Sequence, residues 1–127
     1  MKLLITGAAG FLGSHLCDRF LRDGHHVVGV DNFLTGSLGN VAHLSEEPRF
    51  SFVEADVSRD VPTVDGLDGI LHFASPASPV DYYAHPVATL EVGSLATLRL
   101  LEVARERGAR FMVASTSEVY GLSLIHI

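Results

Sequence analysis

Short apolar runs alternate with longer amphipathic segments along this chain of 127 residues. The apolar runs predict five strands, at residues 2–6, 26–31, 50–54, 69–74 and 110–116. Between them, the spacing of apolar residues predicts helices over 11–23 and from about 87 to 107, each ended by a glycine. Strands that alternate with helices are typical of βαβ units. The pattern therefore predicts an α/β fold with a mostly parallel sheet covered by helices.

Each predicted helix has one apolar face that we expect to pack on the sheet. In the first helix this face comprises Leu12, Leu16, Phe20 and Leu21. In the second helix it comprises Leu90, Leu95, Leu98 and Leu101. Two other segments are predicted as loops: 33–40 is rich in glycine, and SPASPVDYYAHP, at 75–86, contains three prolines, too many for the interior of a helix.

A length of 127 residues suits one domain, and a composition of 47% hydrophobic and 19% charged residues indicates that it is globular. The net charge of −6 argues against nucleic acid or an anionic membrane as a partner. Glycines interrupt the apolar N-terminal run before it resembles a signal peptide, and no run approaches the roughly 18 apolar residues of a membrane span. A cytoplasmic location is therefore expected.

The single cysteine and the histidines predict no further chemistry. Cys17 excludes an internal disulfide, and we interpret it as a small buried residue on a helix. The seven histidines lack the spacing of a helical metal site, so no metal is expected.

The segment LITGAAGFLGSHL places three glycines between the first predicted strand and the first helix. Their spacing is GxxGxxG, whereas the usual dinucleotide fingerprint is GxGxxG. In a dinucleotide site, Gly7 would allow the tight turn, Gly10 the approach of a pyrophosphate, and Gly13 the packing of the helix. The amides near Phe11 and Leu12 would face the phosphates. The alternative is three unrelated turn and packing glycines.

Acidic and small residues at the ends of later strands favour the dinucleotide interpretation. Asp31 follows Gly13 by 18 residues, where a carboxylate would bind the adenosine ribose and repel a 2′-phosphate, so NAD is favoured over NADP. Asp56, after the third strand, is interpreted either as an adenine contact or as the cap of the next turn. Ala74 and Ser75 would leave space for a cofactor or form a simple turn.

The segments TGAAGFLG and STSEVYG resemble the extended short-chain dehydrogenase/reductases, a family of NAD-dependent epimerases and dehydratases. Within it, HFASPASPVDYYAHP, TLEVGSLATLRLLEVARERGARF and ASTSEVYG are most similar to the UDP-glucuronate decarboxylases. The resemblance runs from residue 1 to about 121. It implies a Rossmann-like, doubly wound domain, truncated here after the fifth strand. It also implies that bound NAD oxidises C4 of UDP-glucuronate, the 4-keto acid loses CO2, and the hydride returns to give UDP-xylose.

The resemblance also implies roles for individual residues. Those facing the cofactor would be Gly10, Phe11 and Leu12 at the pyrophosphate, Asp31, Asn32 and Thr35 at the adenosine, Asp56 and Val57 at the adenine, and Phe73, Ala74 and Ser75 at the nicotinamide. Thr116 would hydrogen-bond the sugar C4 oxygen, with Ser117 and Glu118 shaping proton movement and substrate orientation. From the residues alone, the less favoured alternative is that Ser115 to Ser117 form a hydroxyl-rich turn that caps a helix. For Tyr82 and Tyr83, aromatic packing is favoured over a place in the substrate cleft.

The chain departs from the family pattern near its end. The family's general base is the tyrosine of a Tyr-x-x-x-Lys pair, but no lysine follows Tyr120 and the only lysine is Lys2. The apolar tail LSLIHI, at 122–127, does not resemble the family's continuation, so we expect this chain alone to be inactive.

Two other functions remain open at this point. One is a 4,6-dehydratase or 4-epimerase acting on another nucleotide sugar, and the other is a noncatalytic NAD-binding module. The resemblance further implies a homodimer that pairs through the helix at 87–107 and the helix expected after the fifth strand.

Overall fold

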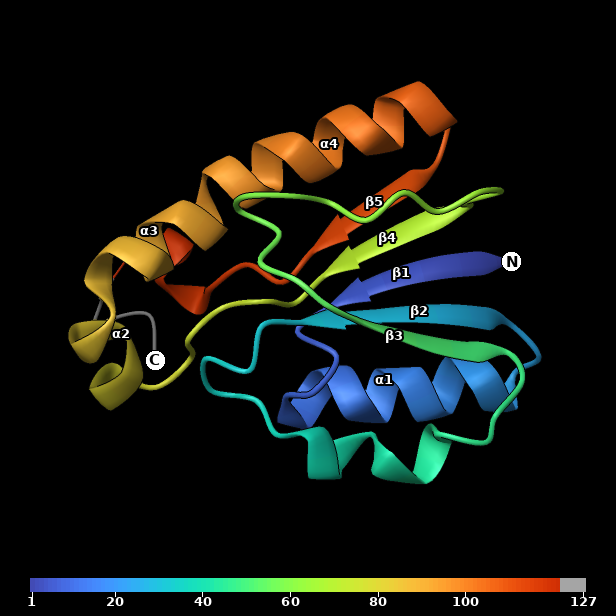
Figure 1. The fold of residues 1–127 in the computed structure, drawn as a ribbon. Coiled ribbons are helices and arrows are strands. Elements are labelled where there is room, and N and C mark those ends of the chain that lie inside the picture. Colours follow the sequence, from blue (N-terminus) through green and yellow to red (C-terminus); the bar gives the residue numbers. More distant parts are fainter. Residues whose placement is uncertain (122–127) are drawn as a thin grey trace.

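Five parallel strands form the centre of the computed structural model, which describes residues 1–121 (Figure 1). The strands are β1 (Lys2–Thr6), β2 (His26–Asp31), β3 (Phe50–Glu54), β4 (Gly69–His72) and β5 (Arg110–Val113). Their order in the sheet is β3-β2-β1-β4-β5, and every neighbouring pair is parallel. The predicted Rossmann-like, doubly wound fold is therefore confirmed. The tail at 122–127 lies outside the described residues.

Helices cover both faces of this sheet. One face carries α1 (Phe11–Arg22), and the other carries α4 (Leu95–Arg107) (Figure 1). Two helices, α2 (Pro79–Ala84) and α3 (Pro86–Gly93), lead from β4 to α4. Short 3-10 turns lie at Leu38–Asn40, Ala42–Leu44 and Ser117–Tyr120. Among residues 1–121 no helix is both long and apolar enough to cross a membrane.

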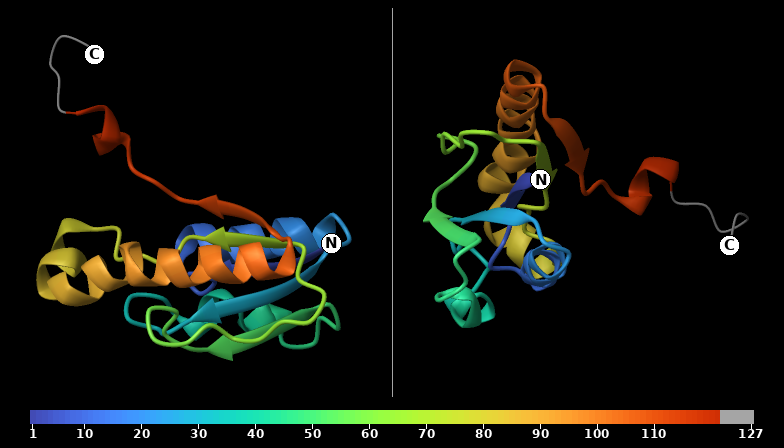
Figure 2. Two further views of the ribbon diagram at one scale, coloured as in Figure 1. Left: turned by 90° about the horizontal axis from the view of Figure 1, so that it is seen from above. Right: turned by 90° about the vertical axis from the view of Figure 1, so that its right-hand side faces the viewer.

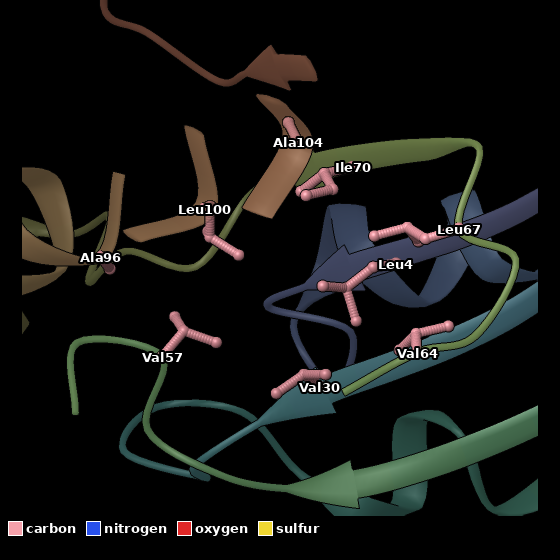
Figure 3. Close-up of a cluster of buried hydrophobic side chains, with 9 residues drawn as sticks. All are labelled: Leu4, Val30, Val57, Val64, Leu67, Ile70, Ala96, Leu100 and Ala104. Atoms are coloured by element: carbon pink, nitrogen blue, oxygen red, sulfur yellow. The ribbon is translucent and has the colours of Figure 1, made fainter. Parts of the chain in front are cut away.

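Alternating side chains of β1 supply both halves of the core. Leu4 belongs to the cluster under α4, together with Leu100 and Ala104 (Figure 3). Leu3 and Ile5 belong to the cluster under α1, together with Cys17. Burial on both faces explains why β1 reads as a continuous apolar run.

Helix α1 buries a face slightly different from the predicted one. Leu21 is buried as expected, but Leu12 is 60% exposed. Gly13 packs against the loop before the helix, and a residue one position earlier points about 100° away from it. Cys17 is fully buried, as expected, and burial, helped by Asp18, raises the pKa of its thiol to about 12. The thiol is therefore structural.

The single helix predicted from about 87 to 107 is interrupted, because α3 ends at Gly93 and α4 begins at Leu95. Ser94 lies between them, and its hydroxyl donates to the carbonyl of Leu90 at 2.6 Å. A glycine followed by a serine that bonds back to the preceding turn is a known cause of a helix bend.

The apolar face predicted for this region was also wrong. Leu90 and Leu98 are 72% and 56% exposed, and Leu95 and Leu101 are exposed as well. The buried face is narrower, and it consists of Ala96, Leu100 and Ala104. Small alanines let α4 approach the sheet, so the larger leucines face away from it.

The proline-rich segment predicted as a loop contains the short helix α2. Pro79 occupies its first turn, where a missing amide hydrogen does no harm, and Ser78 caps it by accepting from the Asp81 amide at 3.3 Å. Pro86 similarly begins α3. The prolines therefore start helices here instead of interrupting them.

Strands β4 and β5 are shorter than the predicted 69–74 and 110–116. Strand β1 ends at Thr6, so the chain after His72 has no further strand to pair with. The amide of Ala74 instead donates to the side-chain oxygen of Thr6 at 3.2 Å.

Candidate functional site

A cleft opens at the carboxyl ends of the central strands. The chain leaves β1 toward one face of the sheet and leaves β4 toward the other, so this edge is the topological switch point where open α/β sheets bind ligands (Figure 1). Ten predicted cofactor residues line the cleft, namely Gly7, Gly10, Asp31, Asn32, Thr35, Asp56, Val57, Phe73, Ala74 and Ser75.

The three glycines of the first loop differ in what surrounds them. A Cβ on Gly7, whose φ is +72°, would lie 2.7 Å from the Phe73 carbonyl oxygen. A Cβ on Gly13 would lie 1.9 Å from the carbonyl oxygen of Gly7. Both positions are glycine because protein backbone occupies the space. A Cβ on Gly10 would meet only that same Gly7 oxygen, at 3.2 Å, and Gly10 lines the cleft. The open side of Gly10 therefore faces the space available to a ligand.

The first turn of α1 offers hydrogen-bond donors beside Gly10. No side chain caps this helix, and among residues 1–121 no hydrogen bond uses the amide of Phe11 or Leu12 as its donor. Free amides and the helix dipole together favour an anion. Phe11, Leu12 and Gly13, the other predicted cofactor residues, are not among those that line the cleft, and the two free amides lie next to Gly10, which does line it.

The Asp31 carboxylate joins the glycine loop to the loop after β2. One oxygen accepts from the Ala9 amide at 2.9 Å, and the other accepts from the Phe33 amide at 2.9 Å. Phe33 adopts a positive φ of 59°, and its ring stacks on Phe52 with centroids 5.4 Å apart. A carboxylate has about four acceptor positions, so two remain for a ligand in the cleft. The sequence did not predict the bracing role of Asp31.

Asp56 caps the turn that follows β3, which favours the second interpretation of this residue. Its Oδ1 accepts from the Ser58 amide at 3.0 Å and from the Ser58 hydroxyl at 2.6 Å. Its Oδ2 lies 3.5 Å from Nε of Arg59. Val57 both lines the cleft and packs in the core under α4.

Several residues that the sequence did not single out complete the site. Thr6 lines the cleft and accepts from the amides of Phe73 and Ala74 at 3.1 and 3.2 Å. Gly36 is packed so closely that a Cβ would lie 3.0 Å from an Asp31 oxygen. Ala88 and Val92 line the cleft from α3. In the sequence, only two features pointed to these residues: Thr6 is a polar residue just before Gly7, and Gly36 is a glycine in the predicted loop at 33–40.

The predicted catalytic residues are not brought to the cleft. Thr116, Ser117 and Glu118 are exposed, on a segment that leads away from the sheet after β5 (Figure 2). Thr116 accepts from the Glu118 amide at 3.2 Å and thus caps the last 3-10 turn. The catalytic roles of these residues stay a prediction.

The two tyrosines of α2 do not line the cleft. The rings of Tyr82 and Tyr83 contact each other, with centroids 5.2 Å apart. Tyr83 is 79% exposed, so for this residue neither the substrate cleft nor aromatic packing beneath a loop is seen.

Comparison with known proteins identifies the family. The model of the "NAD dependent epimerase/dehydratase family" matches residues 3–125. The chain is 46% identical to UDP-glucuronic acid decarboxylase 1 of Danio rerio over 98% of its own length and 29% of the relative's, and 44% identical to UDP-glucuronic acid decarboxylase 1 of Arabidopsis thaliana over 99% and 28%. It thus spans less than a third of these relatives.

Solved structures agree with this result. The dTDP-glucose 4,6-dehydratase DesIV from Streptomyces venezuelae, with NAD bound, matches with a TM-score of 0.81 and 31% identity, over 97% of this chain and 42% of that one. Fold, sequence and the matched model point the same way, and the chain belongs to the NAD-dependent epimerase/dehydratase family.

Proposed function

We propose that this chain is the NAD-binding part of an enzyme that converts UDP-glucuronate to UDP-xylose through a 4-keto intermediate. The observation that carries the proposal is the cleft beside Gly10, where free backbone donors, an open approach and a fixed carboxylate meet. The decarboxylases of Danio rerio and Arabidopsis thaliana support the choice of substrate, because they are 46% and 44% identical to the chain.

The residues present fit NAD in three places. The amides of Phe11 and Leu12 would hold the pyrophosphate, and Asp31 would accept from the adenosine ribose. The loop Phe73–Ser75 would border the nicotinamide. When bound there, NAD supplies a hydride acceptor for C4 of the sugar and later the hydride donor. The hydroxyl of Thr116 is proposed to bond the C4 oxygen once substrate is present.

Release of CO2 tests the proposed reaction. The product of the complete gene, incubated with UDP-glucuronate, is expected to release one CO2 for each UDP-xylose formed without net consumption of NAD. One control omits the sugar nucleotide. A second replaces UDP-glucuronate with UDP-glucose, which has no carboxylate to lose. Formation of an epimerised or dehydrated sugar without CO2 would instead support the second candidate, a 4-epimerase or 4,6-dehydratase, which the likeness to DesIV favours. If no sugar reacts but NAD binds, a noncatalytic module is the better description.

We also propose that the complete protein is a homodimer that uses the exposed leucine face of α3 and α4, formed by Leu90, Leu95, Leu98 and Leu101. Contiguous exposed apolar residues of this kind mark interaction sites. We expect light scattering to give twice the monomer mass, and Leu98→Glu with Leu101→Glu to give the monomer mass. Glu46→Lys, an equally large charge change at an exposed residue of the loop before β3, is the control. A monomeric unmodified protein would contradict the proposal.

A further inference from the structure

His72 is a buried polar residue at the end of an otherwise apolar strand. It closes β4, is 3% exposed and does not line the cleft. Its Nδ1 lies 2.7 Å from the hydroxyl oxygen of Thr6 in β1, and its Nε2 lies 3.0 Å from the carbonyl oxygen of Val92 in α3. The imidazole therefore links two elements that both border the cleft.

The partners of the ring determine where its proton lies. The carbonyl of Val92 can only accept, so Nε2 must carry the hydrogen. In the neutral ring Nδ1 is then an acceptor, and the Thr6 hydroxyl must donate to it. With its hydrogen directed at His72, the Thr6 hydroxyl oxygen presents its lone pairs to the amides of Phe73 and Ala74, which lie at 3.1 and 3.2 Å. The Phe73 amide also donates to the backbone carbonyl of Thr6 at 3.2 Å, so the Ala74 amide is the one that depends on the hydroxyl alone.

We propose that neutral His72 is a positioning residue, which fixes the direction of the Thr6 hydroxyl and thereby holds the loop beginning at Phe73 against α3 on the cofactor cleft. This inference rests on the proposed NAD site. It adds a residue that touches no ligand itself and acts through Thr6. Its consequence is that cofactor affinity depends on the protonation of a group outside the cleft.

Protonation of His72 would reverse the direction of its hydrogen bond with the Thr6 hydroxyl. Nδ1 becomes a donor, so the Thr6 oxygen would face three donors with two lone pairs, and its own hydrogen would lose its acceptor. Burial disfavours the charged ring and lowers the pKa of His72. No charged side chain is among the causes of this shift. The groups that bond the ring from β1 and α3 are uncharged, and from β5 the backbone of Val113 pairs beside it.

Because this pKa is lowered, the ring is neutral above its ordinary value of about 6.5 and takes up its proton only below it. The unfolded chain protonates first as the pH falls. The contribution of His72 to stability is therefore complete above about pH 6.5 and is lost below it, toward the lowered pKa. We expect the affinity for NAD to fall over the same acidic range.

Two substitutions separate the two hydrogen bonds of the ring. In His72→Asn the side-chain oxygen can take the place of Nδ1 and still accept from Thr6, whereas in His72→Gln the amide nitrogen can take the place of Nε2 and donate to Val92. Titration of the complete protein with NAD at about pH 8 should show His72→Asn within about threefold of the unmodified protein and His72→Gln about tenfold weaker, since only the latter leaves the Thr6 hydroxyl without an acceptor. Thr6→Val, which removes the hydroxyl, should lower the affinity for NAD as much as His72→Gln does. Thr6→Ser, which keeps the hydroxyl, should retain the affinity. The acid-dependent loss of affinity should be much smaller in His72→Asn.

Equal affinities of the two His72 variants at high pH, or an unchanged acid response in His72→Asn, would overturn the proposal. If the variants do not fold, nitrogen NMR of the unmodified protein decides, because a proton on Nδ1 above pH 7 contradicts the assigned direction. Absence of NAD binding in the unmodified protein would contradict the proposed function. In that case the NMR result still shows whether His72 sets the direction of Thr6.

Discussion

Gly10→Val is expected to abolish tight NAD binding while the chain keeps its fold. The backbone of Gly10 is extended, with φ −83° and ψ 176°, a conformation open to any L-residue. A Cβ there would lie 3.2 Å from the Gly7 carbonyl oxygen, so this carbonyl must shift by only a few tenths of an ångström. The valine side chain would enter the cleft where the pyrophosphate must approach the free amides of α1. Losing two backbone hydrogen bonds to the charged phosphates, at about 1.5 kcal/mol each or more, is enough to weaken binding on the order of a hundredfold. Calorimetric titration of the complete protein with NAD measures the loss.

Gly13→Ala is the matched comparison within the same loop. Its Cβ would lie 1.9 Å from the Gly7 carbonyl oxygen, so α1 must move away from the loop. We expect a loss of about 3 kcal/mol or more in the free energy of unfolding, whereas Gly10→Ala should change it by less than about 1 kcal/mol. Gly93→Ala, which meets nothing within 4 Å, should leave NAD affinity unchanged and change the free energy of unfolding by less than about 1 kcal/mol. If Gly10→Val binds NAD as tightly as the unmodified protein, the pyrophosphate does not lie against this loop.

The strands that could be predicted most accurately are those whose ends are determined by neighbouring residues in the sequence. β1, β2 and β3 have the expected bounds, because each is an apolar run that ends where a glycine, an acidic residue or a turn follows. The cofactor cleft was predictable for a related reason. In a parallel sheet the carboxyl ends of all strands lie at one edge, so Asp31 and Ala74 meet there although far apart in sequence.

The features that could not be predicted depend on contacts across the sheet. Thr6 and His72 are 66 residues apart, and only the register of β1 with β4 makes them neighbours. Leu98 points outward because the alanines of α4 pack against the sheet instead. The spacing of apolar residues along the sequence does not show which apolar face of a helix is buried. The role predicted for Thr116 is untested for another reason. In the described part of the chain Thr116 lies outside the cleft, and its role depends on a bound substrate.

Asp31→Asn is expected to weaken both the fold and the site, because the carboxylate has a structural as well as a binding role. Both of its oxygens accept buried or half-buried backbone hydrogens, from Ala9 and Phe33. An asparagine offers one oxygen, and its NH2 group would point at the second backbone N–H. Losing one hydrogen bond to a charged acceptor and leaving a buried donor unpaired should lower the free energy of unfolding by about 2–4 kcal/mol. Urea denaturation measures this change, and NAD affinity should fall at least about tenfold with it.

Asp23→Asn is the control for the same chemical change at an exposed position. Its carboxylate pairs with Nε of Arg19 at 2.8 Å on the surface of α1, where an ion pair contributes at most about 1 kcal/mol. We therefore expect stability and NAD affinity close to those of the unmodified protein. If Asp31→Asn also leaves stability unchanged and lowers only the affinity, the carboxylate acts as a ligand alone. The two hydrogen bonds by which Asp31 joins the glycine loop to the loop after β2 would then contribute nothing to the free energy of unfolding.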